Sequence, residues 1–533
     1  MAQSSSPSPS ESGSSSGISE SGISDGGNGS RRTAPHLWAV VLAACAGQFL
    51  VVLDISVVNV ALPSMRGDLG LSGVGLQWVV NAYTLTFAGL LLLGGRAGDL
   101  YGRKRTFLVG LGLFTAASLA GGVAQEPWQL VAARAVQGMG AAVLAPATLT
   151  ILTTTFPEGA ARTRAIATWS AVGAGGGAAG GLVGGLLTDA LSWRWVLLIN
   201  VPVGALVLLA AAVWVAESRE DAARRRLDVL GAVLVTGGLG AVAYGIVRTE
   251  SLGWAALGSL GPLAAGLALL ALFVLVEART AEPLIPLKLF RLRSVSAANL
   301  AMFVCGAAMF SMWYFVSLYM QNVLHFTPVQ AGLGFLPQSF SIVVASKSAP
   351  LLMRRVGSRS VAVGGAALGC VGYVWQSGMH AGGGYLETVC GPGVLIALGA
   401  GFLATPLASV ATEGAAARDA GLVSGLVNTS RTMGGALGLA VLSTVAASRI
   451  DHGGHGSGES PGTLASGYGL AFLTGAGILF ACVVFMILAL PRGRDGHDKR
   501  DGAGPHGQQQ AEAAKKAGDD EEGEREAADA TSR

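Results

Sequence analysis

The sequence has few charged residues. Asp, Glu, Lys and Arg make up 13% of its 533 residues, against about 25% in an average soluble domain, while 51% are hydrophobic. A soluble protein of this size would expose more apolar surface than water could hydrate. The 35 basic and 32 acidic residues leave a net charge of +3, which excludes a strongly basic nucleic-acid-binding protein.

Cysteine is scarce as well. The five cysteines are an odd number, lie mostly within apolar runs and form no CxxC pair, which argues against a disulfide framework or a zinc ribbon. The spans hold no histidine cluster, and we interpret His452 and His455, which lie among glycines, as part of a linker and expect no metal site. No GxxxxGK[ST] phosphate loop occurs, so we expect neither direct use of ATP nor a bound cofactor.

What the sequence does contain is a series of apolar stretches, each near the length of about 20 residues that a helix needs to cross a bilayer. These stretches show no period-two alternation, so the sequence predicts helices and not a barrel. The fourteen predicted spans are 37–61, 76–97, 106–124, 128–151, 165–187, 195–215, 227–247, 255–276, 296–319, 329–350, 360–378, 391–411, 421–447 and 468–490. The predicted fold class is an all-α membrane protein.

Two segments with similar spacing indicate an internal duplication. GRAGDLYGRKR (95–105) follows the second span, and APLLMRRVGSR (349–359) follows the tenth; each is centred on glycine and rich in basic residues. If they correspond, two six-helix halves flank two inserted helices, an arrangement typical of transporters. The predicted domains are an N-terminal half (36–215), the two extra helices with their loops (216–295) and a C-terminal half (296–491).

The two ends of the sequence differ in composition from the rest. Residues 1–35 are rich in Ser, Gly and Pro and lack the apolar region of a secretory signal, and residues 492–533 are charged. We expect both to be disordered tails. Lys and Arg concentrate in the loops on the side of the N-terminus, for example at 103–105, 224–226 and 354–355, and the other side has only Arg66, Arg194, Arg248 and Arg449. This bias predicts a multi-pass plasma (inner) membrane protein with both termini cytoplasmic.

Ionisable side chains within the spans are candidate functional residues, because insertion of each costs about 2.5–3.5 kcal/mol. Asp54 is the only carboxylate deep in a predicted span, and Arg134 lies at a similar depth in the same half. An acid and a base at one level can relieve each other's desolvation. The pair is either a proton site, loaded and released as the two side chains separate, or a static ion pair that fixes helix register. Arg134 shares a helix face with Gln137, three residues on.

Two further cations lie in predicted spans of the C-terminal half. Arg431 belongs to a stripe with Asn428, Gly434, Gly435 and Gly438, and either contacts substrate in a cavity or is satisfied by carbonyls at a helix contact. Lys347 lies near the end of its span and can extend to the interface. Met309, Met312, Trp313 and Phe315 of the ninth span could line a cavity for apolar ligands, or serve packing or lipid contact.

The fifth predicted span has no charge but is rich in glycine. Glycine occupies 176, 180, 181, 184 and 185 among other positions, although each costs about 1 kcal/mol relative to alanine in a soluble helix. The four-residue spacing predicts a groove for a closely crossing helix. The glycines serve either tight packing alone or a pivot on which two halves rock.

Taken together, several motifs resemble a known family over about residues 37–490. GRAGDLYGRKR (95–105) is similar to the signature between helices 2 and 3 of the major facilitator superfamily, and RAVQG (134–138) to its helix 4 motif. LDISVVNVALP (53–63), WVVNAYTL (78–85), WRWVLLINVPVG (193–204), EPLIPLKLFRLRS (282–294) and NTSRTMGGALG (428–438) resemble the fourteen-helix drug:proton antiporters of the EmrB/QacA type.

The resemblance implies roles for particular residues. Asp54 matches the membrane-embedded acid of this group, and Arg134 matches the motif arginine linked to proton coupling. Gly95, Asp99, Gly102 and Arg103 match the signature whose charge pairing latches the outward-open state. Gly176, Gly180, Gly184 and Gly185 match the antiporter motif, in which Gly181 stands where proline is usual; Ser56 replaces a common threonine. The tenth span has no acid, which disfavours divalent cationic substrates.

The expected function is therefore proton-driven export of amphiphilic small molecules by alternating access, by a non-enzyme that works as a monomer in the bilayer and binds no nucleic acid. Two alternatives stay open. One is a dedicated exporter or importer of a single metabolite, such as an antibiotic or a siderophore. The other is a membrane receptor or scaffold that signals through the charged C-terminal tail.

Overall fold

The computed structural model describes residues 37–215, 217, 227–280, 282–413, 415–416, 419–452 and 460–491. The chain divides into Met1–Pro35, which is outside the described residues, and a unit His36–Arg533 that contains every helix. The predicted tails (1–35 and 492–533), His455 and the side chain of His452 also lie outside what the structure describes.

The described residues form helices and no strands, which confirms the all-α prediction. The elements are α1 (Leu37–Leu69), α2 (Gly73–Tyr101), α3 (Arg103–Gly122), α4 (Pro127–Thr155), α5 (Ala160–Ala190), α6 (Arg194–Leu198), α7 (Asn200–Trp214), α8 (Val229–Leu252), α9 (Leu257–Arg279), η1 (Leu287–Arg291), α10 (Arg293–Asn322), α11 (Pro328–Gly334), α12 (Leu336–Val356), α13 (Ser358–Gln376), η2 (Leu386–Cys390), α14 (Gly391–Glu413), α15 (Ala420–His452) and α16 (Pro461–Ala489).

Each of the fourteen predicted spans coincides with a helix or a pair of consecutive helices. Within the described residues, thirteen of these segments are long and apolar enough to cross a membrane. The remaining one, α13, has 19 residues and carries Ser358, Arg359 and Gln376 at its ends, which makes it more polar. The span predicted at 195–215 is divided into α6 and α7, and the one at 329–350 into α11 and α12.

Several helices extend beyond their predicted ends. The prediction ended the first span near Leu62, but α1 continues through Pro63 to Leu69, about two turns further. Proline in a helix removes one backbone hydrogen bond, which the helix tolerates here. The end of the first span was therefore predicted too early.

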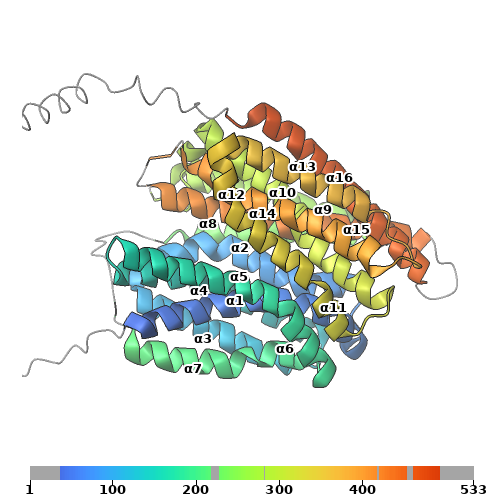
Figure 1. The fold of residues 1–533 in the computed structure, drawn as a ribbon, viewed down its shortest axis with the longest axis horizontal. Helices are drawn as coiled ribbons and strands as arrows, with labels where there is room; N and C mark the ends of the chain where they lie inside the picture. Colours follow the sequence, from blue (N-terminus) through green and yellow to red (C-terminus); the bar gives the residue numbers. More distant parts are fainter. Residues whose placement is uncertain are drawn as a thin grey trace, which may run out of the picture. The chain divides into compact units, whose positions relative to one another are not determined.

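The same pattern of helix contacts occurs twice. In residues 37–214, α4 packs on α2 and α3, α1 packs on α4 and α5, and α7 packs on α1 and α3. In residues 293–489, α14 packs on α12 and α13, α10 packs on α14 and α15, and α16 packs on α10 and α13. Figure 1 shows the first set in blue to green on one side of the described unit and the second in yellow to orange-red on the other. The described helices therefore form two six-helix halves, as expected.

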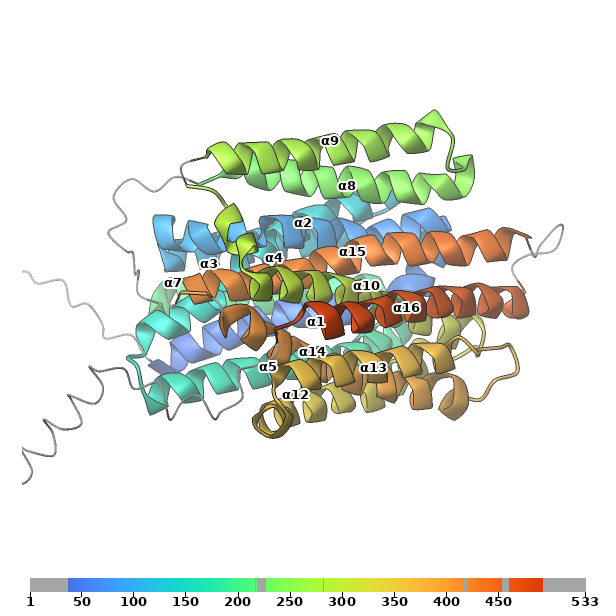
Figure 2. The same ribbon diagram turned by 90° about the horizontal axis from the view of Figure 1, so that it is seen from above.

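The two inserted helices pack against each other as a hairpin. α8 also contacts α2 from the first half and α15 from the second. Figure 2 shows α8 and α9 at one edge of the described helices, with α8 next to α2. The hairpin thus touches both halves without separating them.

The two predicted repeat segments have the same turn. Gly102 is the single residue between α2 and α3, with φ +99°, and Gly357 is the single residue between α12 and α13, with φ +82°. Side chains with a Cβ rarely adopt such positive φ values, which explains why glycine centres both segments.

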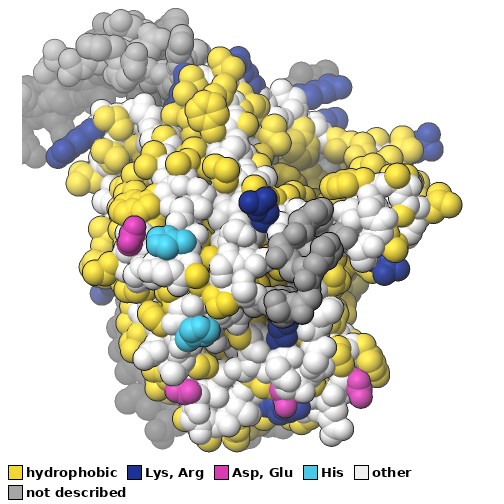
Figure 3. Space-filling model, turned by 90° about the vertical axis from the view of Figure 1, so that its right-hand side faces the viewer, with side chains coloured by type: hydrophobic (Ala, Val, Ile, Leu, Met, Phe, Trp, Pro, Cys, Tyr) yellow, Lys and Arg dark blue, Asp and Glu magenta, His cyan; other side chains and the backbone are white. Residues whose placement is uncertain are grey.

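The halves meet closely at the end of the bundle where α1 and α5 end, which is the predicted outer end. Ser317 Oγ donates to Asn59 O at 2.7 Å, and Gln321 Nε2 donates to Val60 O at 2.9 Å, so α10 is bonded to the α1 backbone. Figure 3 views this end, over which charges of both signs are scattered among larger apolar and uncharged areas.

Candidate functional site

Asp54 on α1 and Arg134 on α4 form a direct ion pair, as the sequence predicted. Arg134 Nη1 donates to Asp54 Oδ2 at 2.6 Å, and the two side chains are 2% and 0% exposed. Water is excluded at such burial, so each charge depends on its protein partners. The packing of α1 on α4 brings these partners together.

Neutral amides complete the carboxylate's surroundings. Gln137 Nε2 and Asn200 Nδ2 donate to Asp54 Oδ1 at 2.7 and 3.1 Å, so the carboxylate accepts three hydrogen bonds in all. Gln137 Nε2 also donates to Ser118 Oγ at 2.7 Å. We refer to Asp54, Arg134, Gln137, Asn200 and Ser118 as the Asp54 network; it joins α1, α3, α4 and α7.

Arg134 is held by α2 as well. Its Nε donates to Val79 O at 3.1 Å, its Nη1 donates to Gln137 Oε1 at 2.7 Å, and its guanidinium carbon lies 4.3 Å from the centre of the Tyr83 ring. A cation over an aromatic face is attracted by the ring quadrupole. The network therefore contacts five helices of the first half.

Sequence reasoning found the two charges and the Gln137 face but missed Asn200, Ser118 and Tyr83. The signal for Asn200 was present, because it is a polar residue in the apolar run WVLLINVPVG (195–204). Ser118 and Tyr83 give no such signal, because both residue types are common in spans. Tyr83 Oη and Asn200 Oδ1 are buried and have no hydrogen-bond partner among the described residues.

The glycines of α5 face two different helices. A Cβ at Gly184 would lie 2.7 Å from Val57 O, and one at Gly176 would lie 3.2 Å from Phe49 O, both on α1; Gly180 approaches Ser56 on the same helix. Gly181 and Gly185 instead face α11, across from Gly332 and Pro328. The predicted close crossing is thus present on one face, and the other face contacts the opposite half.

The predicted latch residues lie at the α2–α3 turn. Arg103 Nη2 is 3.9 Å from Asp99 Oδ1, and Gly95 packs toward Pro146 of α4. No sequence motif indicated Glu217, whose carboxylate accepts hydrogen bonds from the backbone N–H of Lys104 at 3.1 Å and of Arg105 at 3.3 Å. An acid at a helix N-terminus is favourable because the helix dipole is positive there.

The proposed substrate residues lie on two helices. On α15, Arg431 is half-buried and its Nη2 donates to Asn428 Oδ1 at 2.8 Å. Gly434 and Gly438 of the same stripe approach Phe303 and Ala307 on α10, and Gly435 faces the Phe310 ring. This stripe therefore also serves close packing of α15 on α10.

The four candidates on α10 have different surroundings. Met312 and Phe315 are each 2% exposed, and the Phe315 ring packs against Tyr468 and Phe472. Trp313 packs against Phe335 with ring centroids 4.9 Å apart, and Met309 is half-buried. The structure brings Arg431 and Asn428 together, and it places Met312 and Phe315 in the apolar core of the second half.

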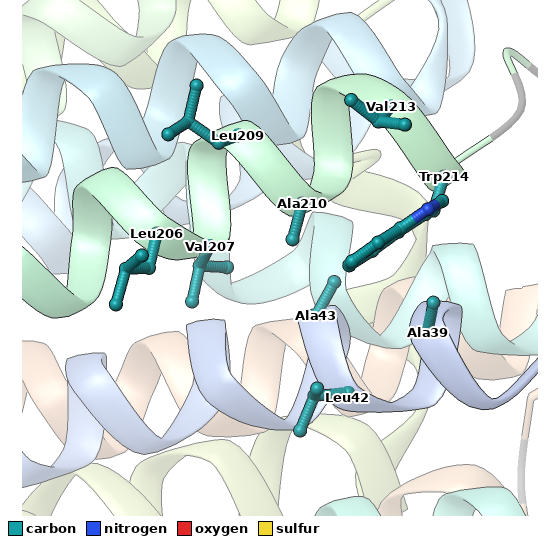
Figure 4. Close-up of a pocket in the computed structure, with 9 residues that line it drawn as sticks. All are labelled: Ala39, Leu42, Ala43, Leu206, Val207, Leu209, Ala210, Val213 and Trp214. Atoms are coloured by element: carbon teal, nitrogen blue, oxygen red, sulfur yellow. The ribbon is translucent and has the colours of Figure 1, made fainter.

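Two hollows lie among the described helices that bear on the site. A groove of about 450 Å³ between α1 and α7 has a purely apolar lining, which Figure 4 shows: Ala39, Leu42, Ala43, Leu206, Val207, Leu209, Ala210, Val213 and Trp214. It has no polar group to orient a ligand. A cavity of about 130 Å³ lies between the halves, lined among others by Gln77, Tyr314, Phe315, Ser443 and Tyr468. No group of three or more His, Cys, Asp or Glu in the described ranges could hold a metal ion.

Comparison with known proteins agrees with this architecture. The model of the Major Facilitator Superfamily matches residues 44–439. The chain is 49% identical over 463 residues to the cephamycin export protein CmcT of Amycolatopsis lactamdurans, covering 86% of this chain and 93% of that one. It is 38% identical over 458 residues to the puromycin resistance protein pur8 of Streptomyces alboniger, covering 84% and 90%.

Solved structures share the fold at low sequence identity. A bacterial homologue of the human lysosomal transporter Spinster, in an inward-facing and unoccupied conformation, is 14% identical with a TM-score of 0.60, covering 85% of this chain and 97% of that one. The peptide transporter PepTSo is 14% identical with a TM-score of 0.63 and the same coverage. Given the family match over most of the described helices and these two identities to full-length relatives, the chain is a member of the major facilitator superfamily.

Proposed function

We propose that this chain is a proton-driven exporter of amphiphilic small molecules, antibiotics among them, that works as a monomer in the plasma membrane with both termini in the cytoplasm. Its relatives are named for export of cephamycin and for resistance to puromycin, and a further one as a multidrug resistance protein. The fold supports a transporter, because its membrane-spanning helices form two halves that can move against each other.

The observation that carries proton coupling is the buried carboxylate of Asp54. All three partners of this carboxyl group donate to it and none accepts a hydrogen bond from it, which is the pattern of an ionised carboxylate. A proton bound at Oδ2 would weaken the bond from Arg134 Nη1, because it neutralises the carboxylate and adds a donor hydrogen on the side that faces the arginine. Tyr83 Oη and Asn200 Oδ1 can bind the water molecule that delivers this proton.

Loss of this ion pair changes the packing of the whole first half. Arg134 on α4 is bonded to α2, and Asp54 on α1 is bonded to α4 and α7, so their separation frees these helices to shift. We place the motion between residues 36–215 and 296–491. The glycine contacts of α5 with α11 close the predicted outer end in the present state, and the proton binds from the outside once this end has opened.

Arg431 is the side chain that we assign to substrate binding. Its guanidinium has five donor hydrogens and its only hydrogen-bond partner within the described residues is Asn428. It is half-buried, unlike Arg134. A polar group of an amphiphilic substrate can therefore bind the remaining donors while the apolar part contacts α10.

The test is transport by Asp54→Asn in proteoliposomes with an imposed pH gradient. The variant stays neutral at every pH, so gradient-driven accumulation of substrate is lost, while exchange of substrate for substrate without net proton movement is retained. Retained exchange shows that the variant is folded. Asp68→Asn is the matched control, because it alters the same residue type on the same helix, at a site half exposed and paired with Arg194.

Full gradient-driven transport by Asp54→Asn would refute the proton role. A second variant, Asp99→Asn, tests the latch: it slows transport and leaves substrate binding near normal, because the 3.9 Å pair with Arg103 lies outside the binding site. Unchanged turnover would show that residues 95–105 only anchor the topology.

Export of one antibiotic is the second candidate function. The relatives at 49% and 38% identity are each named for a single antibiotic. An efflux screen in drug-sensitive cells, with wild type beside Asp54→Asn, separates the two: a dedicated exporter protects against one chemical class, and a multidrug exporter protects against several.

A further inference from the structure

Two carboxylates lie at the end of the inserted hairpin nearest the α2–α3 turn. Asp228 precedes α8 as its N-cap and accepts a hydrogen bond from Gly231 N at Oδ1, at 2.8 Å. Glu277 lies in the last turn of α9, and its Oε2 accepts from Ile285 N at 3.4 Å. The two residues are 8% and 2% exposed, within the apolar core that contains Phe273.

The other oxygen of each carboxylate has no partner. Asp228 Oδ2 and Glu277 Oε1 are buried and bind no donor among the described residues. The antiparallel packing of α8 on α9, in which a Cβ at Gly238 would lie 3.2 Å from Gly266 O and one at Gly245 would lie 2.8 Å from Leu263 N, brings Asp228 and Glu277 to the same end of the hairpin. The remaining charged side chains on neighbouring elements are Arg96 on α2, Arg279 on α9, Glu282 in the connecting segment and Lys288 in η1, and none of them forms a described ion pair with Glu277 or Asp228.

Two buried carboxylates with no cation paired to them in the described part of the chain cannot both be ionised at low cost. A single proton shared by Glu277 Oε1 and Asp228 Oδ2 removes one of the two negative charges. It also supplies the hydrogen-bond donor that these two oxygens lack. Deprotonation would leave two adjacent anions in apolar surroundings, which favours outward rotation of Glu277 into water.

This pair is connected to α2 through the segment after α9. Ile285 N binds Glu277, and two residues earlier Pro283 O accepts a hydrogen bond from Arg96 Nη1 at 2.6 Å. Arg96 precedes the latch residue Asp99 by three positions. α8 also packs tightly on α2, where a Cβ at Gly89 would lie 3.1 Å from Thr236 Cα. Movement of Glu277 is therefore transmitted to the end of α2 that holds the latch.

We propose that Glu277 and Asp228 form a second proton-binding site, separate from the Asp54 network, whose bound proton keeps the inserted hairpin fastened to the latch end of α2. The site lies on the predicted cytoplasmic side, so it responds to cytoplasmic pH and does not carry the transported proton. Rising pH removes the proton, the two anions repel, the segment 282–285 detaches and Arg96 loses its backbone acceptors.

The test is hydrogen exchange of residues 282–285 and of the latch end of α2 in the full-length protein, across about pH 5 to 9, which brackets ordinary and strongly perturbed carboxyl groups. After correction for intrinsic exchange, wild type loses protection by about tenfold per pH unit above the titration of the site, because detachment is linked to release of one proton. Glu277→Gln keeps its protection at every pH, since its amide donates to Asp228 in place of the proton. Glu158→Gln, an exposed carboxylate on the same predicted side, follows wild type.

A second measurement does not depend on the behaviour of that variant. The infrared carbonyl band of a protonated carboxylic acid disappears at a lower pH in Asp228→Asn than in wild type, because Glu277 stays buried but no longer faces a second anion. Asparagine still caps α8 at Gly231 N, so this variant folds. Protection in wild type that is independent of pH, protection that depends on sodium but not on protons, or a band that disappears at the same pH in Asp228→Asn as in wild type would each overturn the proposal.

Discussion

The two six-helix halves each contain an arginine inside a spanning helix, and their surroundings differ. Arg134 of the first half binds a carboxylate, an amide oxygen, a backbone carbonyl and an aromatic ring, and is fully buried. Arg431 of the second half binds one amide oxygen and is half-buried. The first arginine is committed to the interior of its own half, whereas the second has donors left for another molecule.

The scaffold around these arginines does not differ in the same way. In the first half α5 crosses α1 through Gly176, Gly180 and Gly184, and in the second half α15 crosses α10 through Gly434 and Gly438. Small residues allow this approach in both cases. The difference between the halves thus lies in a few polar side chains on an equivalent framework, and our proposal of proton handling in one half and substrate contact in the other rests on this difference.

The largest expected effect comes from removing Arg134, and removing Arg431 provides the comparison. Arg134→Gln lowers the free energy of unfolding by about 3–5 kcal/mol, because Asp54 is left either ionised without a cation or forced to take up a proton. Arg431→Gln lowers it by about 1 kcal/mol, the value of one hydrogen bond. Thermal unfolding in detergent measures both. Equal losses of unfolding free energy in the two variants would mean that both arginines stabilise the fold to the same extent. The contrast between the halves would then be wrong.

A double-mutant cycle sharpens the same contrast. Adding Asp54→Asn to Arg134→Gln removes the second charge of the pair, so the double variant is more stable than the sum of the single effects predicts, with a coupling energy of about 2 kcal/mol. The matching cycle of Asn428→Ala with Arg431→Gln has a coupling of about 0.5 kcal/mol, as for other side-chain pairs on one helix face. A coupling at Arg431 as large as that at Arg134 would contradict the assignment.

The shared scaffold predicts similar effects of matched glycine substitutions. Gly184→Ala places a methyl group 2.7 Å from Val57 O, and Gly438→Ala places one against Ala307. Overpacking of this kind costs about 1–3 kcal/mol. Gly177→Ala is the control, because its Cβ would lie 3.5 Å from Val52 Cγ1, an ordinary contact. A loss of stability in only one half would show that the two crossings are not equivalent.

The smallest effect on stability is expected at the turn between α2 and α3. Glu217→Gln weakens the N-terminus of α3 by about 0.5 kcal/mol, because the amide interacts less favourably with the helix dipole and with Arg105. High salt reduces the difference between this variant and wild type, since the site is exposed. An effect that salt does not change would indicate a contact other than a charge interaction.

The sequence predicted the helices and the central ion pair because both have strong physical signals. Long apolar runs allow only helices in a bilayer, and a lone acid and a lone base in one half have few other partners. The pairing of Asp54 with Arg134 is confirmed. The predicted ends of α1 and α15 came too early in the sequence. A helix can continue beyond the membrane core through polar residues such as Arg66, so the end of the apolar run does not mark the end of the helix.

What could not be predicted depends on contacts between distant segments. Glu217 comes 113 residues after Lys104, whose backbone it binds, and no local pattern indicates that approach. Glu277 was missed for another reason: the predicted span ended at 276, so the carboxylate was assigned to a loop. The roles of the latch, the glycine motif and the substrate residues stay predictions, because they concern motion and binding.

The contact between α5 and α11 has a practical consequence. Gly181 lies against Gly332, and Gly185 lies against Pro328, so main chain meets main chain with no side chain between them. Because no side chain lies at this contact, no change of rotamer can make room for a larger residue. Any side chain larger than hydrogen therefore holds the two helices apart. Replacement of Gly185 by alanine, valine and leucine in turn should increase the separation of α5 and α11 step by step. Such variants would supply crystallographers with trapped intermediates of the cycle.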